Sequence, residues 1–161
     1  MNVGTARQRL TANPGTYALV LELSTASKLR IGGLGTRTFE PSVYFYSGSA
    51  FGSVGLFGRL KHHLALSPRP HWHIDYLRYV AAVVQVWTTC DSRRLECAWS
   101  AAARSLRGST EVPGFGASDC GCTSHLVKLA RFPRPSRFRR HLRLSPTCKP
   151  ISVFRLNASA A

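Results

Sequence analysis

Short apolar runs separated by turn residues dominate the hydrophobic pattern of this chain. Runs rich in β-branched and aromatic residues predict strands over residues 17–23, 28–31, 36–39, 43–46, 81–88 and 125–130. Apolar residues spaced three and four apart predict helices over residues 56–66 and 93–106. This mixture predicts an α/β (α+β) fold, in which a small three- to four-stranded, mainly antiparallel sheet is flanked by helices.

The chain has 161 residues, which suits one domain with or without a tail. Residues 1–13 form a short lead-in that ends at a turn signal, Asn13-Pro14-Gly15. Residues 14–130 hold the predicted strands and helices and form the expected domain. Residues 131–161 contain eight Lys or Arg and no acidic residue. We expect this last segment to be a basic, flexible tail that orders on contact with a partner.

Basic residues far outnumber acidic ones, with 22 Lys or Arg against seven Asp or Glu and a net charge of +15. Without the last 31 residues the chain stays basic, with 14 basic and seven acidic residues. Such an excess predicts a polyanionic partner, DNA or else RNA. Surface arginine that serves no partner is the alternative explanation.

The sequence also predicts a protein of the cytoplasm. No apolar run is long enough to span a bilayer, and no signal peptide is evident, so we expect no membrane partner. The five cysteines are an odd number, which argues against a disulfide framework and for a reducing compartment.

Five residues with the chemistry of phosphodiester cleavage follow one another along the chain. Tyr17 and Tyr46 lie on two predicted strands, Arg59 and His63 share one helix face, and Glu96 lies on the second helix. An arginine fork matches phosphate oxygens, and a carboxylate can hold Mg²⁺. Each residue alone also has an ordinary explanation: strand tyrosines pack, basic helix faces are solvated, and an exposed glutamate pairs with a neighbouring arginine.

The order of these residues resembles that of the GIY-YIG nuclease superfamily. The strings that carry the resemblance are Gly15-Thr16-Tyr17 and Tyr46-Ser47-Gly48, followed by Arg59, His63 and Glu96. Two longer strings, over residues 71–77 (HWHIDYL) and 114–126 (GFGASDCGCTSHL), resemble an uncharacterised prokaryotic branch of it. That branch occurs alone or fused to endonuclease III-type DNA repair glycosylases. The resemblance spans residues 15–126, which is most of the chain.

The resemblance implies a role for each of the five residues. Tyr17 and Tyr46 match the two signature tyrosines, and Tyr17 would receive a proton from the attacking water. Arg59 matches the helix arginine that binds the scissile phosphate, and His63, four residues on, would contact a phosphate or shuttle a proton. Glu96 matches the glutamate that holds a single Mg²⁺ or Mn²⁺.

The chain departs from the family pattern at two points. Thr16 and Ser47 replace isoleucines, which we interpret as packing positions. Tyr17 and Tyr46 are 29 residues apart, which is wider than usual and implies an inserted hairpin around residues 28–39.

A second group of polar residues has several possible roles. If residues 71–75 are extended, His71, His73 and Asp75 face one side and could bind Fe(II), Zn²⁺ or Mn²⁺. Cys120, Cys122 and His125 could add zinc ligands, but Cys-x-Cys lacks the common two-residue spacer. We expect instead that hydrogen bonds pin these two strings together beside the substrate groove, without a structural zinc. In that arrangement the residues that contact the substrate are Lys61, His71, His73, Ser118 and Asp119.

The sequence therefore predicts a metal-dependent endonuclease or DNA-processing domain, with a link to DNA repair and to a repair glycosylase and a place beside the prokaryotic nucleoid. A non-catalytic nucleic-acid-binding module with the same fold is the alternative. A zinc-stabilised interaction domain is a third possibility. The sequence leaves the oligomeric state open.

Overall fold

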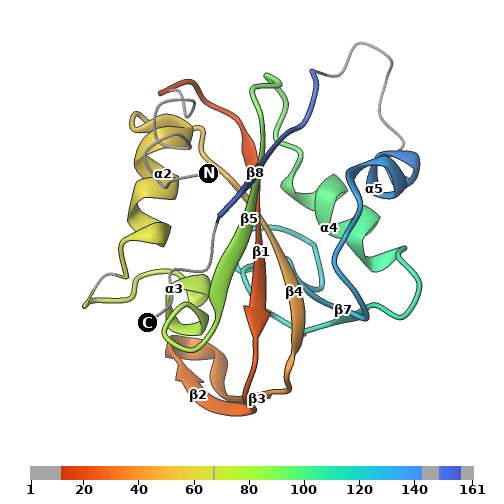
Figure 1. Ribbon diagram of the computed structural model, residues 1–161. Helices are drawn as coiled ribbons and strands as arrows, with labels where there is room; N and C mark the ends of the chain where they lie inside the picture. The colour runs from red at the N-terminus through yellow and green to blue at the C-terminus, as the bar shows by residue number, and fades with distance from the viewer. Residues whose placement is uncertain (1–11, 67, 143–148, 157–161) are drawn as a thin grey trace.

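The protein is built on a six-stranded sheet with helices on both faces (Figure 1). The computed structural model describes residues 12–66, 68–142 and 149–156. The strand order is β6-β7-β4-β1-β5-β8, and each of these pairings is antiparallel. The strands are β1 (Thr16–Leu23), β4 (Ser42–Ser49), β5 (Ala82–Thr89), β6 (Thr110–Glu111), β7 (Leu126–Leu129) and β8 (Ser152–Arg155). The predicted mainly antiparallel α/β fold is confirmed, but the sheet has six strands where three or four were expected.

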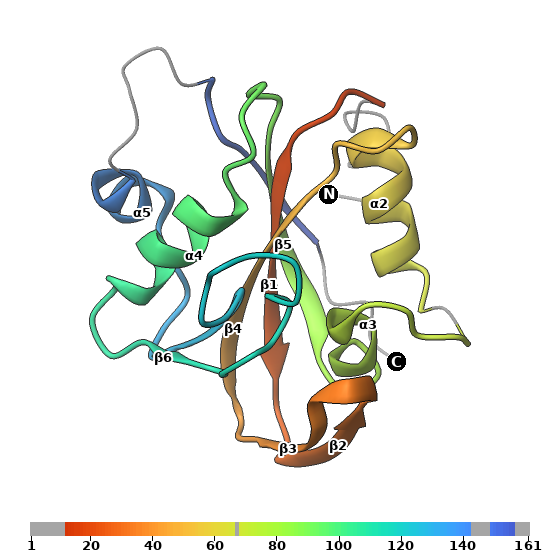
Figure 2. The same ribbon diagram turned by 180° about the vertical axis from the view of Figure 1, so that it is seen from behind.

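Four helices are described, and they divide between the two faces of the sheet (Figures 1 and 2). They are α2 (Gly55–Leu64), α3 (His73–Leu77), α4 (Glu96–Arg104) and α5 (Pro135–His141). Leu60 of α2 and Leu77 of α3 join one buried cluster, whereas Trp99 of α4 and Phe138 of α5 join the other. No helix in the described part of the chain has the length and apolar character to cross a bilayer.

Strand β1 lies inside the sheet and is buried on both faces. Its odd-numbered side chains, such as Leu19 and Leu21, enter the cluster under α2 and α3. Its even-numbered side chains, Ala18 and Val20, enter the cluster under α4 and α5. Because side chains alternate along a strand, a strand covered on both faces needs a continuous apolar run, as residues 17–21 provide.

The hairpin predicted between the two tyrosine strings forms. Strands β2 (Ser27–Ile31) and β3 (Gly35–Phe39) pair around the 3₁₀ turn η1 (Gly32–Leu34) as a separate two-stranded sheet. It lies at the end of the molecule away from Tyr17, at the bottom of Figure 1. This insertion therefore lengthens the sequence between the tyrosines without entering the six-stranded sheet.

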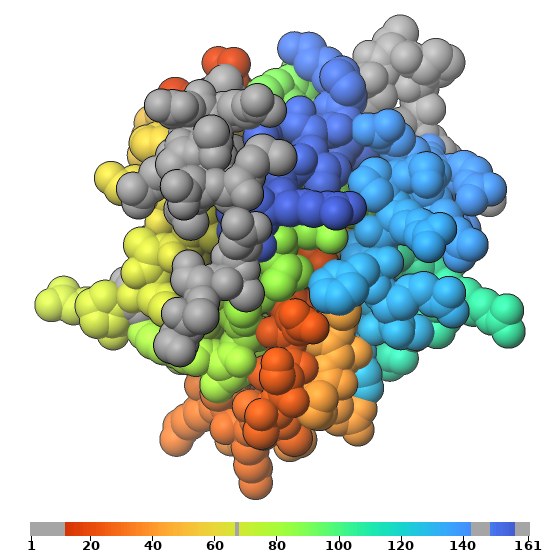
Figure 3. All heavy atoms as spheres, in the orientation of Figure 1, coloured from red at the N-terminus to blue at the C-terminus, as the bar shows by residue number. Residues whose placement is uncertain are grey.

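Residues 131–161 are not a separate tail where the structure describes them, so the predicted boundary at residue 130 is wrong. Phe138 of α5 is fully buried, with its ring against those of Phe45, Trp87 and Trp99. Strand β8 pairs with β5 at the sheet edge. Figure 3 shows both segments, in blue, packed onto the rest of the protein. The segment alternates Arg with Phe and Pro, so its few apolar residues show no helix or strand period from which their burial could be predicted. The rest of the tail and most of the lead-in lie outside the described residues.

Candidate active site

A cleft of about 480 Å³ gathers most of the predicted site residues. It opens among the start of β1, the end of β4, helices α2 and α3, the first turn of α4, and the loop of residues 112–125 that crosses the sheet in Figure 2. Eight of the ten predicted residues line it: Tyr17, Tyr46, Arg59, His71, His73, Glu96, Ser118 and Asp119. His63 is buried and does not line the cleft, and Lys61 is exposed on α2 and does not line it either.

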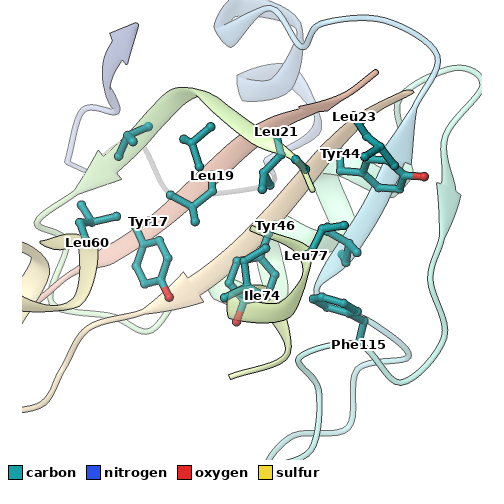
Figure 4. Packing of buried hydrophobic residues seen from close by; sticks show 14 of the residues in the cluster. Tyr17, Leu19, Leu21, Leu23, Tyr44, Tyr46, Leu60, Ile74, Leu77 and Phe115 are labelled. Carbon is teal, nitrogen blue, oxygen red and sulfur yellow. The ribbon is translucent and has the colours of Figure 1, made fainter. Parts of the chain in front are cut away.

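The two tyrosines meet because β1 and β4 are neighbours. Their rings lie 6.4 Å apart between centroids, and Figure 4 shows both hydroxyls pointing to the same side of the sheet. Tyr17 lies opposite Gly48 in the β1–β4 register. A Cβ atom on Gly48 would come within 2.5 Å of the Tyr17 ring. The glycine after Tyr46-Ser47 therefore makes the space that the Tyr17 ring occupies.

Tyr17 is the first member of a hydrogen-bonded chain that runs into the protein. Its hydroxyl lies 2.8 Å from Nε2 of His63, and Nδ1 of His63 lies 2.8 Å from Oδ1 of Asp75. His63 lies on α2, four residues after Arg59. Arg59 on this helix face reaches the cleft, whereas His63 is buried behind Tyr17.

Asp75 fixes the direction of each hydrogen bond in this chain. Burial alone would raise its pKa, but hydrogen bonds from His63, the Trp72 and His71 backbone amides, and His62 hold that pKa well below its usual range. The carboxylate is therefore ionised and can only accept. His63 must then donate from Nδ1, which leaves Nε2 to accept the Tyr17 proton.

These bonds also correct the predicted arrangement of residues 71–75. Helix α3 begins at His73, so His71, His73 and Asp75 do not share one face of an extended segment. Asp75 points to the histidines of α2 instead. The string has no Gly or Pro that would mark the start of this short helix.

Burial sets the protonation states around Tyr17. Burial, assisted by Tyr46, raises the pKa of Tyr17 well above its usual value, although Arg59 opposes the rise. Burial also lowers the pKa of His63, despite the favourable contact with Asp75. The resting state is therefore a neutral tyrosine that donates to a neutral histidine.

Arg59 presents a cation to the cleft with little to neutralise it. Its guanidinium lies 4.0 Å above the Trp72 ring, a cation–π contact. Its Nε is buried and has no hydrogen-bond partner among the described residues. A buried donor without a partner is uncommon and suits a ligand that carries acceptor oxygens.

Glu96 begins α4, and Thr16 and Ser47, the two residues at which the chain departs from the GIY-YIG pattern, hold that turn. Thr16 Oγ1 accepts a hydrogen bond from the Leu95 amide at 3.0 Å, and Ser47 Oγ donates one to the Glu96 carbonyl at 2.9 Å. Both side chains are fully buried. Thr16 and Ser47 are therefore polar anchors of the Glu96 turn, where packing positions were expected.

The Glu96 carboxylate itself is available to a cation. Its Oε2 is buried and has no partner within the described residues. The alternative explanation from sequence was an ion pair with a neighbouring arginine, but Arg93 bonds to Asp91 and Arg104 bonds to Glu111. Magnesium keeps most of its waters and needs only one or two protein carboxylates, so Glu96 can hold such an ion here.

Sequence reasoning missed several residues of the cleft wall. Arg94 lines it, with its guanidinium 4.9 Å from the Phe51 ring and a hydrogen bond to Ser49. Trp72 lines it beneath Arg59. In the sequence these two are simply an arginine and a tryptophan within residues 15–126. Such residues are too common for their type alone to predict a site.

The predicted contact between the two polar strings forms through other atoms than expected. His73 Nδ1 accepts a hydrogen bond from the Gly116 amide at 3.0 Å, and its ring lies against Phe115. The ring of His125 faces Cys97 and Cys120.

Four potential metal ligands meet where α4 approaches the loop of residues 112–125. They are Cys97, Cys120, Cys122 and His125, whose ligand atoms all lie within 4.8 Å of one another. The sequence placed Cys97 apart from the others, because 22 residues separate it from Cys120. Burial and the two neighbouring thiols raise the pKa of Cys97.

Comparison with known proteins identifies the family of the chain. The family model described as "Domain of unknown function DUF123" matches residues 16–143. No curated protein and no solved structure matches the chain. The matched segment runs from the start of β1 past the end of α5, so it includes the cleft, the four clustered ligands and the helix that sequence reasoning assigned to a tail. Because this segment covers most of its length, the chain belongs to the DUF123 domain family.

Proposed function

We propose that this protein is a metal-dependent endonuclease or DNA-processing enzyme of the GIY-YIG type, which hydrolyses phosphodiester bonds in the cleft. The observation that carries the proposal is a pair of buried, unpartnered polar atoms of opposite charge beside one tyrosine. Arg59 Nε and Glu96 Oε2 lack partners among the described residues, and both side chains line the cleft with Tyr17. A phosphate and a divalent cation would satisfy both atoms together.

The hydrogen-bonded chain gives Tyr17 a way to act as a base despite its raised pKa. A water molecule in the cleft gives a proton to the Tyr17 oxygen as its own oxygen attacks phosphorus. The Tyr17 hydroxyl proton passes at the same time to His63 Nε2, 2.8 Å away. Asp75 then faces an imidazolium at 2.8 Å and stabilises its charge. Tyr17 thus relays the proton and never needs to persist as a phenolate.

The remaining charges act on the phosphate. Arg59 binds its oxygens and stabilises the extra negative charge that develops as water attacks. A single Mg²⁺ or Mn²⁺ held by Glu96 would stabilise the charge on the leaving oxygen. Arg94, on the cleft wall, can contact a neighbouring phosphate.

The substrate we propose is DNA, with RNA as the alternative, and the process is DNA repair. The net charge of +15 supports a polyanionic substrate. The repair role and the link to a repair glycosylase rest on the GIY-YIG resemblance of residues 15–126.

A DNA cleavage assay of the Glu96→Gln variant tests the proposal. The substrates are a panel of branched and damaged DNAs, each with Mg²⁺, Mn²⁺ or a chelator. Glutamine keeps the shape and removes the charge, so we expect cleavage to be lost and DNA affinity to stay within about twofold. Glu22→Gln, an exposed glutamate on β1, is the matched control and should cleave normally.

The outcomes separate the candidate functions. Wild-type turnover by Glu96→Gln would remove Glu96 from the chemistry. If the wild-type protein binds these DNAs but cleaves none with either metal, the non-catalytic binding module replaces the nuclease.

A further inference from the structure

We propose that Cys97, Cys120, Cys122 and His125 form a structural zinc site that joins the first turn of α4 to the loop of residues 112–125. This site is separate from the Mg²⁺ or Mn²⁺ position at Glu96 and does not depend on the proposed nuclease activity. It replaces our expectation from sequence that these residues hold no zinc.

The geometry fits tetrahedral zinc. Nε2 of His125 lies 3.6 Å from Cys97 Sγ and 3.4 Å from Cys120 Sγ. Zinc with bonds of about 2.3 Å to sulfur and about 2.0 Å to nitrogen places those atoms about 3.5 Å apart in a tetrahedron. The ligand atom of Cys122 completes the set within 4.8 Å of the others.

Hydrogen bonding alone does not explain the cluster. A neutral imidazole nitrogen has one lone pair, yet two thiols approach Nε2 of His125 at similar distances. Thiols are also weak donors, so three of them around one imidazole gain little from one another. One cation at the centre would bind all four side chains at once.

The fold positions these ligands through contacts that need no metal. The backbone of His125 is fixed on both sides, since its amide donates to Phe115 and its carbonyl accepts from Ser47. Ser100 of α4 donates to the Ser124 carbonyl at 2.6 Å. The loop is therefore tied to α4 and to β4 beside the four ligands.

The choice of metal follows from the ligand set. Three thiolates and one imidazole are soft and borderline ligands that select Zn²⁺ over Mg²⁺ or Mn²⁺. Four protein ligands leave no open position, which is typical of structural zinc. The site could not be predicted from sequence spacing, because Cys-x-Cys-x₂-His supplies only three ligands and the fourth lies on α4.

The site would hold two walls of the cleft in place. Cys97 follows Glu96 directly, and Ser118 and Asp119 directly precede Cys120. A zinc ion between Cys97 and Cys120 would fix the distance between Glu96 and the loop wall. It acts as a positioning device and has no direct role in the chemistry.

Metal analysis of the full chain, purified without chelators, tests the proposal. We expect one zinc per chain and protection of three of the five cysteines from a thiol reagent until zinc is removed. Cys122→Ser should lose the zinc, whereas Cys90→Ser, outside the cluster, should retain it. Glu96→Gln should also retain it, which separates this proposal from the proposed function.

Cobalt substitution keeps the test decisive if Cys122→Ser fails to fold. Co²⁺ in the wild-type protein should give thiolate charge-transfer bands and the intense visible bands of tetrahedral coordination. Purified protein that lacks zinc, exposes five reactive thiols and gives no such spectrum would overturn the proposal. A disulfide among the three cysteines, found by mass spectrometry, would overturn it as well.

Discussion

At the scale of single residues, the candidate site depends on partners that convert ordinary side chains into reactive ones. Tyr17 on its own is a buried strand tyrosine with a raised pKa. His63 gives it a proton acceptor, and Asp75 sets the tautomer that makes His63 an acceptor. In the proposed mechanism the three side chains act as one unit, so we expect the loss of any one to disable the others.

Acid should destabilise the protein in two steps. Burial lowers the pKa of His63, and the nearby Arg59 and His62 lower it further, whereas Asp75 opposes the shift. Below about pH 6.5 the unfolded chain therefore binds a proton that the folded chain does not. The free energy of unfolding therefore decreases as the pH is lowered, by up to about 1.4 kcal/mol per pH unit for each such group. Below about pH 4, Asp75 adds a second loss of the same sign, because its pKa is lowered on folding.

Urea denaturation at several pH values measures this effect. His63→Gln should flatten the dependence between about pH 7 and 5, leaving the contributions of His73 and His125, whose pKa burial also lowers. An unchanged slope in His63→Gln would contradict the assignment of His63 as a buried, neutral histidine.

Gly48→Ala should displace the Tyr17 ring. The new Cβ would lie 2.5 Å from ring atoms of Tyr17, so the ring must shift. We expect a stability loss of about 1–3 kcal/mol and a loss of cleavage larger than the stability change explains. Gly33→Ala, where a Cβ meets no atom within 4 Å and which does not line the cleft, is the control. Full activity in folded Gly48→Ala would show that Tyr17 does not need this position.

At the scale of secondary-structure elements, helices α2, α3 and α4 each place part of the site. Helix α2 carries Arg59 and His63 one turn apart, and α3 brings Asp75 to them. Helix α4 presents Glu96 at its start, anchored by Thr16 and Ser47. Helix α5 does not line the cleft, but its Phe138 packs against Trp99 of α4.

Phe138→Ala should destabilise the whole domain. The side chain is fully buried against three aromatic rings, so its removal leaves a cavity that costs about 3–5 kcal/mol. Phe132→Ala, at a side chain that is 43% exposed, is the matched control and should cost far less. Thermal or urea unfolding measures both. Equal stability of the two variants would restore the interpretation of this segment as a tail.

At the scale of the whole molecule, charge and fold act together. The net charge of +15 favours a polyanion at any point of the surface, and the cleft brings a cation, a carboxylate and a tyrosine together in one hollow. The exposed arginines of residues 134–140 lie on or beside α5, away from the cleft lining. We therefore assign them to affinity and not to chemistry.

Replacement of Arg134, Arg137 and Arg140 by glutamine tests this assignment. Each phosphate contact contributes about 0.9 to the slope of log affinity against log salt, so the slope should fall by up to about 3. Cleavage at saturating DNA should stay unchanged. Arg139 is kept because it donates to the Ile151 carbonyl. A loss of turnover at saturation would place this face in the active site.

The long patterned segments were predicted from sequence, together with the short strands β2, β3 and β7, whereas other short elements were missed. The apolar run of β1 and the stripe of α4 were sufficient to predict these elements, because each carries a full period of its pattern. Helices α3 and α5 and strands β6 and β8 have two to seven residues. At that length tertiary contacts, such as those of Phe138, outweigh local preference.

The sequence alone identified the candidate residues of the site: tyrosines, an arginine, histidines and a glutamate in a fixed order on predictable elements. Only the tertiary structure decided which of them meet. Asp75 joins His63, Cys97 joins His125, and Thr16 and Ser47 anchor Glu96, all across turns and loops. The physical reason is that periodicity fixes the face on which a side chain lies, whereas the distance between two elements depends on how the whole chain packs.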